Sequence, residues 1–346
     1  MNIRFPLLSF VFPFGTTANW AKAPFEYVWG TAHHVLPDTH SEESGYFSLC
    51  EGNDGRIYVG TAKYGENAYL VEFDPVTEKQ RIVVDAHKLC NLDAKGFAAQ
   101  AKFHTRNFVG PSGVIYVGTK QGYAKKGDES EYPGGHLITY DPRNDTARNL
   151  GMPYTKQGIA DVVADESRGL IYVVTCEDQH WMLYDTATKK FTELGPMLTP
   201  YATTLMDGDG KAHALTKDFQ LATYDPVTKK VTQRPIEIGD KTFTRESRSA
   251  IPTWNLDADG RTAWLILMND AHLLSIDLSS KGKKVKGTNH GLMLKGEKPD
   301  SRSALTIAPD GRIYTLISVQ NKTGFGKGKL HHLCRYDQKK RLHEDL

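Results

Sequence analysis

The chain contains 346 residues, of which 39% are hydrophobic and 24% charged, and its 43 Lys and Arg residues nearly balance its 41 Asp and Glu residues. This composition is typical of a globular protein and argues against a nucleic-acid partner, because the basic residues are dispersed and matched by acidic ones. No linker or low-complexity stretch divides the sequence, so one domain accounts for it.

The first 23 residues have the pattern of a secretory signal peptide. Arg4 supplies a positive charge, residues 5–14 are apolar but too few to span a bilayer, and Ala21-Lys22-Ala23 offers a small-x-small cleavage site. A frayed apolar N-terminus is the alternative. We therefore expect a signal peptide over residues 1–23, a folded domain over residues 24–346, no membrane association, and a secreted or periplasmic location.

Six copies of one short pattern follow, at a spacing of roughly fifty residues. Each copy has a β-rich run, a polar loop and a second run that ends in Asp, and the copies begin at Gly55, Gly113, Gly169, Ala212, Ala263 and Gly311. Such a repeat is the signature of propeller blades with four strands each. The sequence therefore predicts an all-β fold, a β-propeller with six visible blade repeats.

The first copy shows how one blade is built. We expect strands over residues 46–51, 56–61, 68–73 and 80–84, with Asn53-Asp54-Gly55 as a tight turn, because Gly accepts positive φ. No later stretch has a long 3.6-residue apolar period, so helices should be few. Residues 341–346 form the outer strand of the sixth copy, and residues 27–36 remain for one further strand.

Several common kinds of site are not indicated. The sequence has no Gly-rich phosphate loop, no Ser-His-Asp order and no zinc spacing. The four cysteines also lack metal spacing. Cys50, Cys176 and Cys334 fall in or at the end of predicted strands, so buried free thiols are favoured over a disulfide framework.

In a propeller, ligands bind where blade loops converge on the channel, at the starts of the inner strands and in the loops between second and third strands. The candidates for binding or catalysis at these positions are His104, Arg106, Lys120, Tyr123, His136, Gln157, Tyr201, Arg248 and Arg302. A ring rich in Arg, Lys, Tyr and His suits an anionic, hydroxylated ligand such as an acidic sugar.

His104 and Arg106 form the densest part of this set. They are two residues apart on a predicted strand, so their side chains should leave from one face and share a ligand. For an isolated pair, a hydrogen-bonded channel histidine and a structural ion pair remain the stronger interpretation. Residues 120–135 form the longest inter-strand loop, which is either functional or a solvated excursion.

Four segments resemble a known family of enzymes. Residues 43–49 read ESGYFSL, residues 60–73 read GTAKYGENAYLVEF, residues 102–110 read KFHTRNFVG and residues 132–136 read YPGGH. These runs resemble secreted seven-bladed β-propeller enzymes that act on L-rhamnose-α-1,4-D-glucuronate ends of arabinogalactan and gum-arabic side chains. The resemblance extends over most of residues 27–346. It implies a seventh blade, of which residues 27–36 would be a remnant, leaving an incomplete ring.

The family resemblance implies two alternative chemistries. In the lyases, β-elimination takes place in the anterior channel, with His104 and Tyr201 as the catalytic candidates and Arg106, Arg248 and Arg302 neutralising the substrate carboxylate. The related α-L-rhamnosidases use a lone histidine on the posterior face, for which His33, His34 and His40 are candidates. A propeller that binds without catalysis stays open as a third alternative.

We expect the partner to be an acidic oligosaccharide or polysaccharide, and the protein to be a monomer if the ring closes. No cofactor or metal ligand set is predicted, although the channel leaves room for a divalent cation such as calcium.

Overall fold

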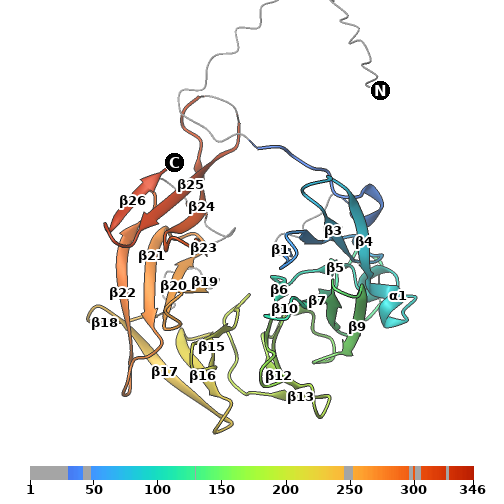
Figure 1. The fold of residues 1–346 in the computed structure, drawn as a ribbon, viewed down its shortest axis with the longest axis horizontal. Coiled ribbons are helices and arrows are strands. Elements are labelled where there is room, and N and C mark those ends of the chain that lie inside the picture. The colour runs from blue at the N-terminus through green and yellow to red at the C-terminus, as the bar shows by residue number, and fades with distance from the viewer. Residues whose placement is uncertain are drawn as a thin grey trace, which may run out of the picture.

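The computed structural model describes residues 30–41, 48–128, 130–244, 252–295, 299–300, 305–324 and 327–346. These residues form six blades of antiparallel strands arranged around a central space, each made from consecutive strands of the chain, and the fourth and fifth blades share one sheet (Figure 1). The predicted β-propeller architecture is confirmed.

The first three blades contain most of the candidate binding residues named above. Their strands are β1 (Leu49–Glu51), β2 (Ile57–Gly60), β3 (Tyr69–Phe73) and β4 (Gln80–Asp85); β5 (Lys102–Phe103), β6 (Phe108–Val109), β7 (Ile115–Lys120), β8 (Leu137–Asp141) and β9 (Thr146–Gly151); and β10 (Ile159–Asp165), β11 (Leu170–Thr175), β12 (Trp181–Asp185) and β13 (Lys190–Glu193). The expected strands of the first copy match β1 to β4 within a few residues.

The other three blades follow in chain order. Their strands are β14 (Leu205–Met206), β15 (Ala212–Leu215), β16 (Gln220–Asp225), β17 (Lys230–Ile238) and β18 (Lys241–Thr242); β19 (Pro252–Leu256), β20 (Thr262–Leu267), β21 (His272–Asp277) and β22 (Val285–Leu292); and β23 (Leu305–Ile307), β24 (Ile313–Gln320), β25 (Lys329–Asp337) and β26 (Leu342–Asp345). Residues 341–346 lie at the outer strand of the sixth blade, as predicted.

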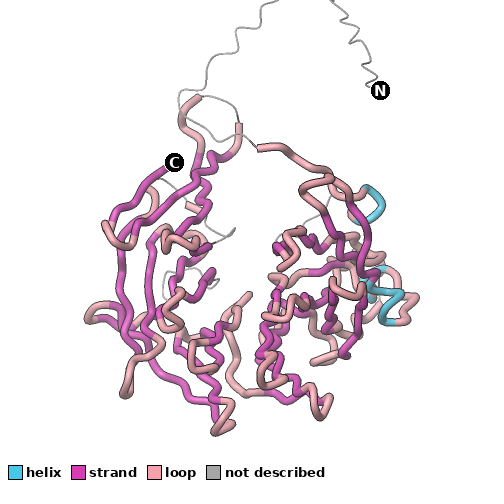
Figure 2. Tube along the Cα trace, viewed as in Figure 1, coloured by secondary structure: helices cyan, strands magenta, loops and turns pink. Residues whose placement is uncertain are grey.

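Helical segments are short and lie on the outside of the ring (Figure 2). They are the 3-10 turns η1 (Pro37–Thr39) and η2 (Gly96–Ala98) and the single-turn helix α1 (Ala86–Cys90), whose first turn is capped by the Asp85 side chain accepting from the Lys88 backbone N–H. Within the described ranges, no helix is long and apolar enough to cross a membrane.

The hydrophobic core is divided among the interfaces between blades. Among the described residues, one cluster of buried apolar side chains fills each interface between consecutive blades, from the first and second to the fifth and sixth. A middle blade is covered on both faces, and every residue of β10 is accordingly buried. Close approach also explains the glycine of the I-Y-V-G-T motif, because a Cβ at Gly118 would lie 2.4 Å from Ile159 of the next blade.

The fourth and fifth blades are joined more closely than the others. β17 continues past its own blade, and residues 236–238 pair in parallel with residues 285–287 of β22. The outer strands of two blades thereby become one continuous sheet. This pairing was not predicted from the repeat pattern.

The ends of the ring face one another without a ladder between them. In Figure 1 the blade β1–β4 and the blade β23–β26 lie on opposite sides of an interval at the top of the view, and no described strand bridges it. Residues 30–36 do not form a strand, unlike the expectation for residues 27–36. They instead run along the first blade, where Gln80 Nε2 donates to the His34 carbonyl (2.8 Å) and the Leu36 N–H donates to Gln80 Oε1 (3.2 Å).

All four cysteines are free thiols. Cys176 and Cys334 are buried as expected, whereas Cys50 is only partly buried. Burial raises the pKa of the Cys50 and Cys334 thiols to about 12, so both stay protonated at neutral pH.

Candidate functional site

A group of titratable side chains gathers at one end of the first four blades. Its members come from equivalent places, namely the loops between second and third strands and the ends of the inner strands. They are Tyr64, Lys102, His104, Lys120, Tyr123, Cys176, Glu177 and Tyr201. We call this group the channel-end site.

Two buried lysines form the base of the channel-end site. Lys102 and Lys120 are direct partners in the ladder between β5 and β7, and they are only 2% and 7% exposed. Like charges directly opposite each other destabilise a strand pair, and buried cations need compensation. The surrounding residues must therefore offset both charges.

Lys120 is compensated by the loop that follows β11. Its Nζ donates to Glu177 Oε1 and to Cys176 Sγ, each 2.5 Å away. Burial alone would lower the pKa of Lys120, but the thiol and the carboxylate raise it above its ordinary value. Lys120 is thus a fixed ammonium group.

Lys102 is held by two tyrosines. Its Nζ donates to the Tyr64 hydroxyl (3.3 Å) and lies 4.9 Å from the ring centroids of both Tyr64 and Tyr123. The rings stabilise the cation through their quadrupoles. Tyr123 is 70% exposed, so an aromatic face lies open beside the buried cation.

His104 lies next to both lysines and against Tyr201. Its side chain is buried, and its ring centroid is 5.6 Å from that of Tyr201. Burial, reinforced by the positive charges of Lys102 and Lys120, lowers the pKa of His104 to about 3. The imidazole is therefore neutral at physiological pH and can accept a proton.

Tyr201 has a strained backbone. Its φ of 53° is in the left-handed region, which bulky residues seldom adopt, and Glu177 shares this feature with a φ of 79°. Such strain concentrates at functional sites. Burial raises the pKa of the Tyr201 phenol, with a further contribution from Cys176, so the hydroxyl stays protonated at neutral pH.

Arg106 points to a different set of partners from those of His104. Its Nε donates to Asp161 Oδ1 and its Nη1 to the Trp254 carbonyl of β19, each at 3.3 Å. Asp161 is buried, and its second oxygen accepts from the Thr204 N–H (2.8 Å). Arg106 therefore links the second, third, fourth and fifth blades through these contacts, and it forms the structural ion pair that the sequence favoured for an isolated pair.

The candidates Gln157 and His136 lie around the channel-end site and are not among its members. Gln157 is buried and exchanges two hydrogen bonds with Asp178, which fixes the loop that carries Glu177. The His136 ring interacts with Asn149 Oδ1 (3.2 Å) on the outer strand β9. Gln157 thus supports the site, whereas His136 is directed toward the periphery of its blade.

The three N-terminal histidines lie along the first blade. His33 is exposed and packs on Phe73 at the end of β3 (4.8 Å), and the rings of His34 and His40 are 5.2 Å apart. His40 Nε2 also lies 3.2 Å from the Val35 carbonyl oxygen. Phe73 and Tyr64 are at opposite ends of β3 and its preceding loop, so His33 is at the opposite end of the blade from the channel-end site.

Arg248 and Arg302 lie outside the described residues, as do residues 1–23, so the expected convergence of three arginines remains a prediction. In the described part of the chain, no group of three or more His, Cys, Asp or Glu side chains could hold a metal ion.

Sequence reasoning did not assign roles to Tyr64, Lys102, Cys176 and Glu177. The signal for Lys102 was available, because it precedes His104 by two residues just as Arg106 follows it. Glu177 could have been identified from its position in a loop between second and third strands.

Comparison with known proteins supports the fold. The sequence matches no family model, and no curated protein matches it. Among solved structures, the WD40 repeats of RRP9 have a TM-score of 0.54 at 9% identity, over 88% of this chain and 81% of that one. A proposed 6-phosphogluconolactonase from Bacteroides uniformis has the same TM-score at 12% identity, over 86% and 83%.

A third similar structure is the extracellular domain of a proposed hybrid two-component system from B. thetaiotaomicron. It has a TM-score of 0.52 at 14% identity, and the match covers 89% of this chain but 36% of that chain. This chain therefore spans about a third of the length of that protein. At these identities, the similarities show a propeller fold alone.

Proposed function

We propose that the protein is a lyase that cleaves terminal L-rhamnose-α-1,4-D-glucuronate linkages of arabinogalactan or gum-arabic side chains by β-elimination at the channel-end site. The observation that carries the proposal is a buried, neutral imidazole, His104, packed against a protonated phenol, Tyr201, beside two buried ammonium groups. A base, an acid and cations are the groups that elimination from a uronate requires.

His104 is the proposed base. It takes the proton from C5 of the glucuronate, and the electron pair left behind forms the double bond between C4 and C5. The bond between C4 and the bridging oxygen breaks, and that oxygen leaves with the rhamnose. Tyr201 gives its proton to the leaving oxygen, and solvent restores both groups afterwards.

The lysines are the proposed partners of the substrate carboxylate. C5 becomes acidic when the adjacent carboxylate can accept charge, which a nearby ammonium stabilises. Lys102 is the first candidate for this role, because its Nζ lies beside the exposed ring of Tyr123. A bound carboxylate would also raise the pKa of His104 from its low value and so strengthen the base.

The exposed ring of Tyr123 provides a surface for a sugar ring next to Lys102. The similarity to an extracellular domain and the N-terminal signal pattern support a secreted or periplasmic location, where polysaccharide side chains are accessible.

The test uses gum arabic as substrate, with unsaturated-uronate absorbance and free rhamnose measured together. The wild type should produce both signals in equal amounts. His104→Gln and Tyr201→Phe should each lower turnover by about 10²–10⁴-fold, the typical contribution of a positioned acid or base. His180→Gln is the matched control, since His180 pairs with Glu193 and stacks on Tyr154.

Each alternative has its own outcome. Rhamnose without absorbance would show hydrolysis and direct attention to His33, His34 and His40. Neither signal, in a protein that binds the polysaccharide, would show a binding module.

A further inference from the structure

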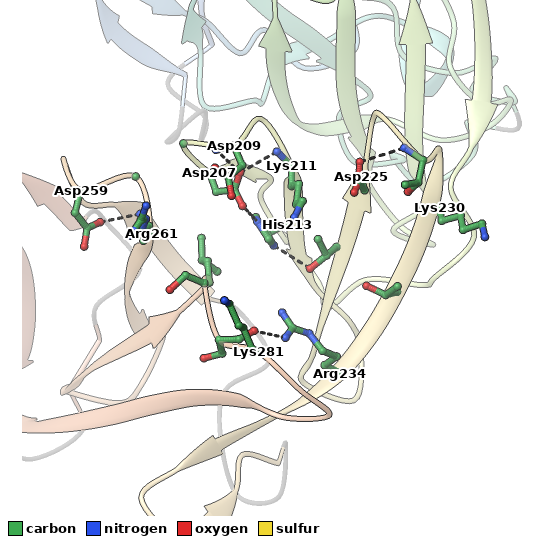
Figure 3. A pocket seen from close by; sticks show the side chains of 18 residues that line it. Asp207, Asp209, Lys211, His213, Asp225, Lys230, Arg234, Asp259, Arg261 and Lys281 are labelled. Carbon is green, nitrogen blue, oxygen red and sulfur yellow. Dashed lines mark hydrogen bonds and ion pairs between the residues drawn. The ribbon is translucent and has the colours of Figure 1, made fainter.

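A second polar cavity lies between the fourth and fifth blades, away from the channel-end site. It has a volume of about 870 Å³ and is lined by the turns β14–β15, β16–β17, β19–β20 and β21–β22 together with strand faces of the fourth blade. Figure 3 shows the turns of the two blades facing each other across it. We call this cavity the interblade groove.

The interblade groove is closed by contacts between the two blades. On one side, the Gly208 N–H donates to the Gly260 carbonyl (2.8 Å), so the β14–β15 and β19–β20 turns touch. Arg234 Nη1 donates to the Ser280 carbonyl (2.5 Å) across the groove (Figure 3). The parallel pairing of β17 with β22 holds the outer strands together. The groove is therefore formed before any ligand binds.

Four carboxylates line the interblade groove, and three of them, those of Asp207, Asp225 and Asp259, accept hydrogen bonds from nearby groups of the protein. Asp207 accepts from His213 Nε2 (2.9 Å) and from the Lys211 backbone N–H (2.9 Å). Asp225 and Asp259 each accept from backbone N–H groups of their own turns. Burial would raise the pKa of Asp207, but the His213 hydrogen bond lowers it below its ordinary value.

Unlike these carboxylates, the cationic side chains that line the interblade groove lack partners of opposite charge in the described part of the chain. Five cationic side chains line it: Lys211, Lys230, Arg234, Arg261 and Lys281. Within the described residues none of these five forms an ion pair with a carboxylate. Ammonium and guanidinium groups without carboxylate partners attract oxyanions.

The uncharged side chains that line the groove indicate which class of ligand it would bind. Hydroxyl groups are added by Thr223, Thr228, Thr232, Ser279 and Ser280, and Leu278 is the sole large apolar side chain among the described residues of the lining. Among the described lining residues the only aromatic ring is the imidazole of His213, which is buried and hydrogen-bonded at both nitrogens to Thr223 and Asp207. We propose that the interblade groove binds a hydrophilic small molecule that carries two or more phosphate or sulfate groups. This site is independent of the proposed lyase activity.

Isothermal titration calorimetry at low ionic strength tests the proposal with two probes, inorganic tripolyphosphate and sucrose octasulfate. The wild-type protein should bind at least one of them, and the one that binds identifies phosphate or sulfate as the preferred group. Arg261→Gln combined with Lys281→Gln should weaken that binding by about tenfold or more, because each charged contact is worth roughly that factor.

The matched control is Lys189→Gln combined with Lys190→Gln. It removes the same charge from the β12–β13 turn of the third blade, where Lys190 lies opposite Asp185 in the strand ladder, as Lys230 lies opposite Asp225 in the fourth blade. The control should bind like the wild type, and circular dichroism should show both variants folded. Absence of binding to both probes, or equal weakening in the two double variants, would overturn the proposal.

Discussion

The buried histidine of the channel-end site links its chemistry to the stability of the fold. His104 has a pKa of about 3 in the folded protein, whereas an unfolded histidine has a pKa of about 6.5. Because the folded pKa is depressed, the unfolded state binds the proton first as the pH falls. The contribution of His104 to stability is therefore complete above about pH 6.5 and is lost progressively toward pH 3.

We predict that this loss can be measured by urea denaturation between pH 7 and pH 4. The free energy of unfolding of the wild type should fall by up to roughly 1.4 kcal/mol per pH unit more than that of His104→Gln, which cannot titrate. Parallel pH profiles for the two proteins would mean that the imidazole is not shielded from protonation.

Removing Glu177 from its ion pair with Lys120 should destabilise the protein more than removing Lys120. The Lys120 side chain is 9% exposed and that of Glu177 is 37% exposed. Glu177→Gln leaves a buried ammonium without its carboxylate and should cost about 1–3 kcal/mol. Lys120→Met leaves a carboxylate that water can reach, so its cost should be smaller. Thermal or urea unfolding of both variants measures the difference, and equal costs would contradict it.

The positions of Arg106 and Lys102 show which side-chain contacts a sequence pattern does not predict. The rule that residues two apart share a strand face would put Arg106 beside His104. Residues 104–107 instead lie between the separate short strands β5 and β6, where regular alternation is interrupted. Arg106 turns to Asp161, and Lys102 and Lys120 are the cations whose charges act on His104. No periodicity in one sequence identifies a partner 55 residues away.

At the scale of elements, the turns and strand ends were predictable and the pairing between blades was not. Asp-Gly turns and alternating β-branched runs predicted β1 to β4 because these signals are local. The extension of β17 depends on residues 285–287, which lie about one blade further along the chain. Its sequence, with Pro235 inside the strand, gives no local sign of this partner.

We predict that this extension stabilises the ring. Ile236 is fully buried at the point where β17 meets β22, so Ile236→Ala should cost about 2–5 kcal/mol in free energy of unfolding. Ile82 in β4 is 44% exposed, and Ile82→Ala is the matched control with an expected cost near 0.5 kcal/mol. Urea denaturation measures both losses in free energy of unfolding. Similar losses for the two variants would show that the joining of the outer strands does not stabilise the ring.

At the scale of the whole molecule, the ring brings together residues that are far apart in the sequence. Tyr64, His104, Glu177 and Tyr201 belong to or border four successive blades. They gather at one end of the ring because the loops between second and third strands and the ends of the inner strands lie at that end of each blade. The repeat in the sequence predicted that such positions lie at one end of the ring, but it did not assign roles to Tyr64 and Glu177. The repeat alone does not predict the open interval between the first and sixth blades, because ring geometry depends on the angle at which blades pack, whereas the family resemblance did imply an incomplete ring.

The most direct test of the proposed elimination is the mass of the uronate product. An oligosaccharide ending in L-rhamnose-α-1,4-D-glucuronate is incubated with the protein, and the shortened saccharide is examined by mass spectrometry. Elimination at His104 and Tyr201 yields an unsaturated uronate that is lighter by one water than the hydrolysis product, and His104→Gln should yield almost none. A product with the full hydrolytic mass, or an undiminished yield from His104→Gln, would contradict the account.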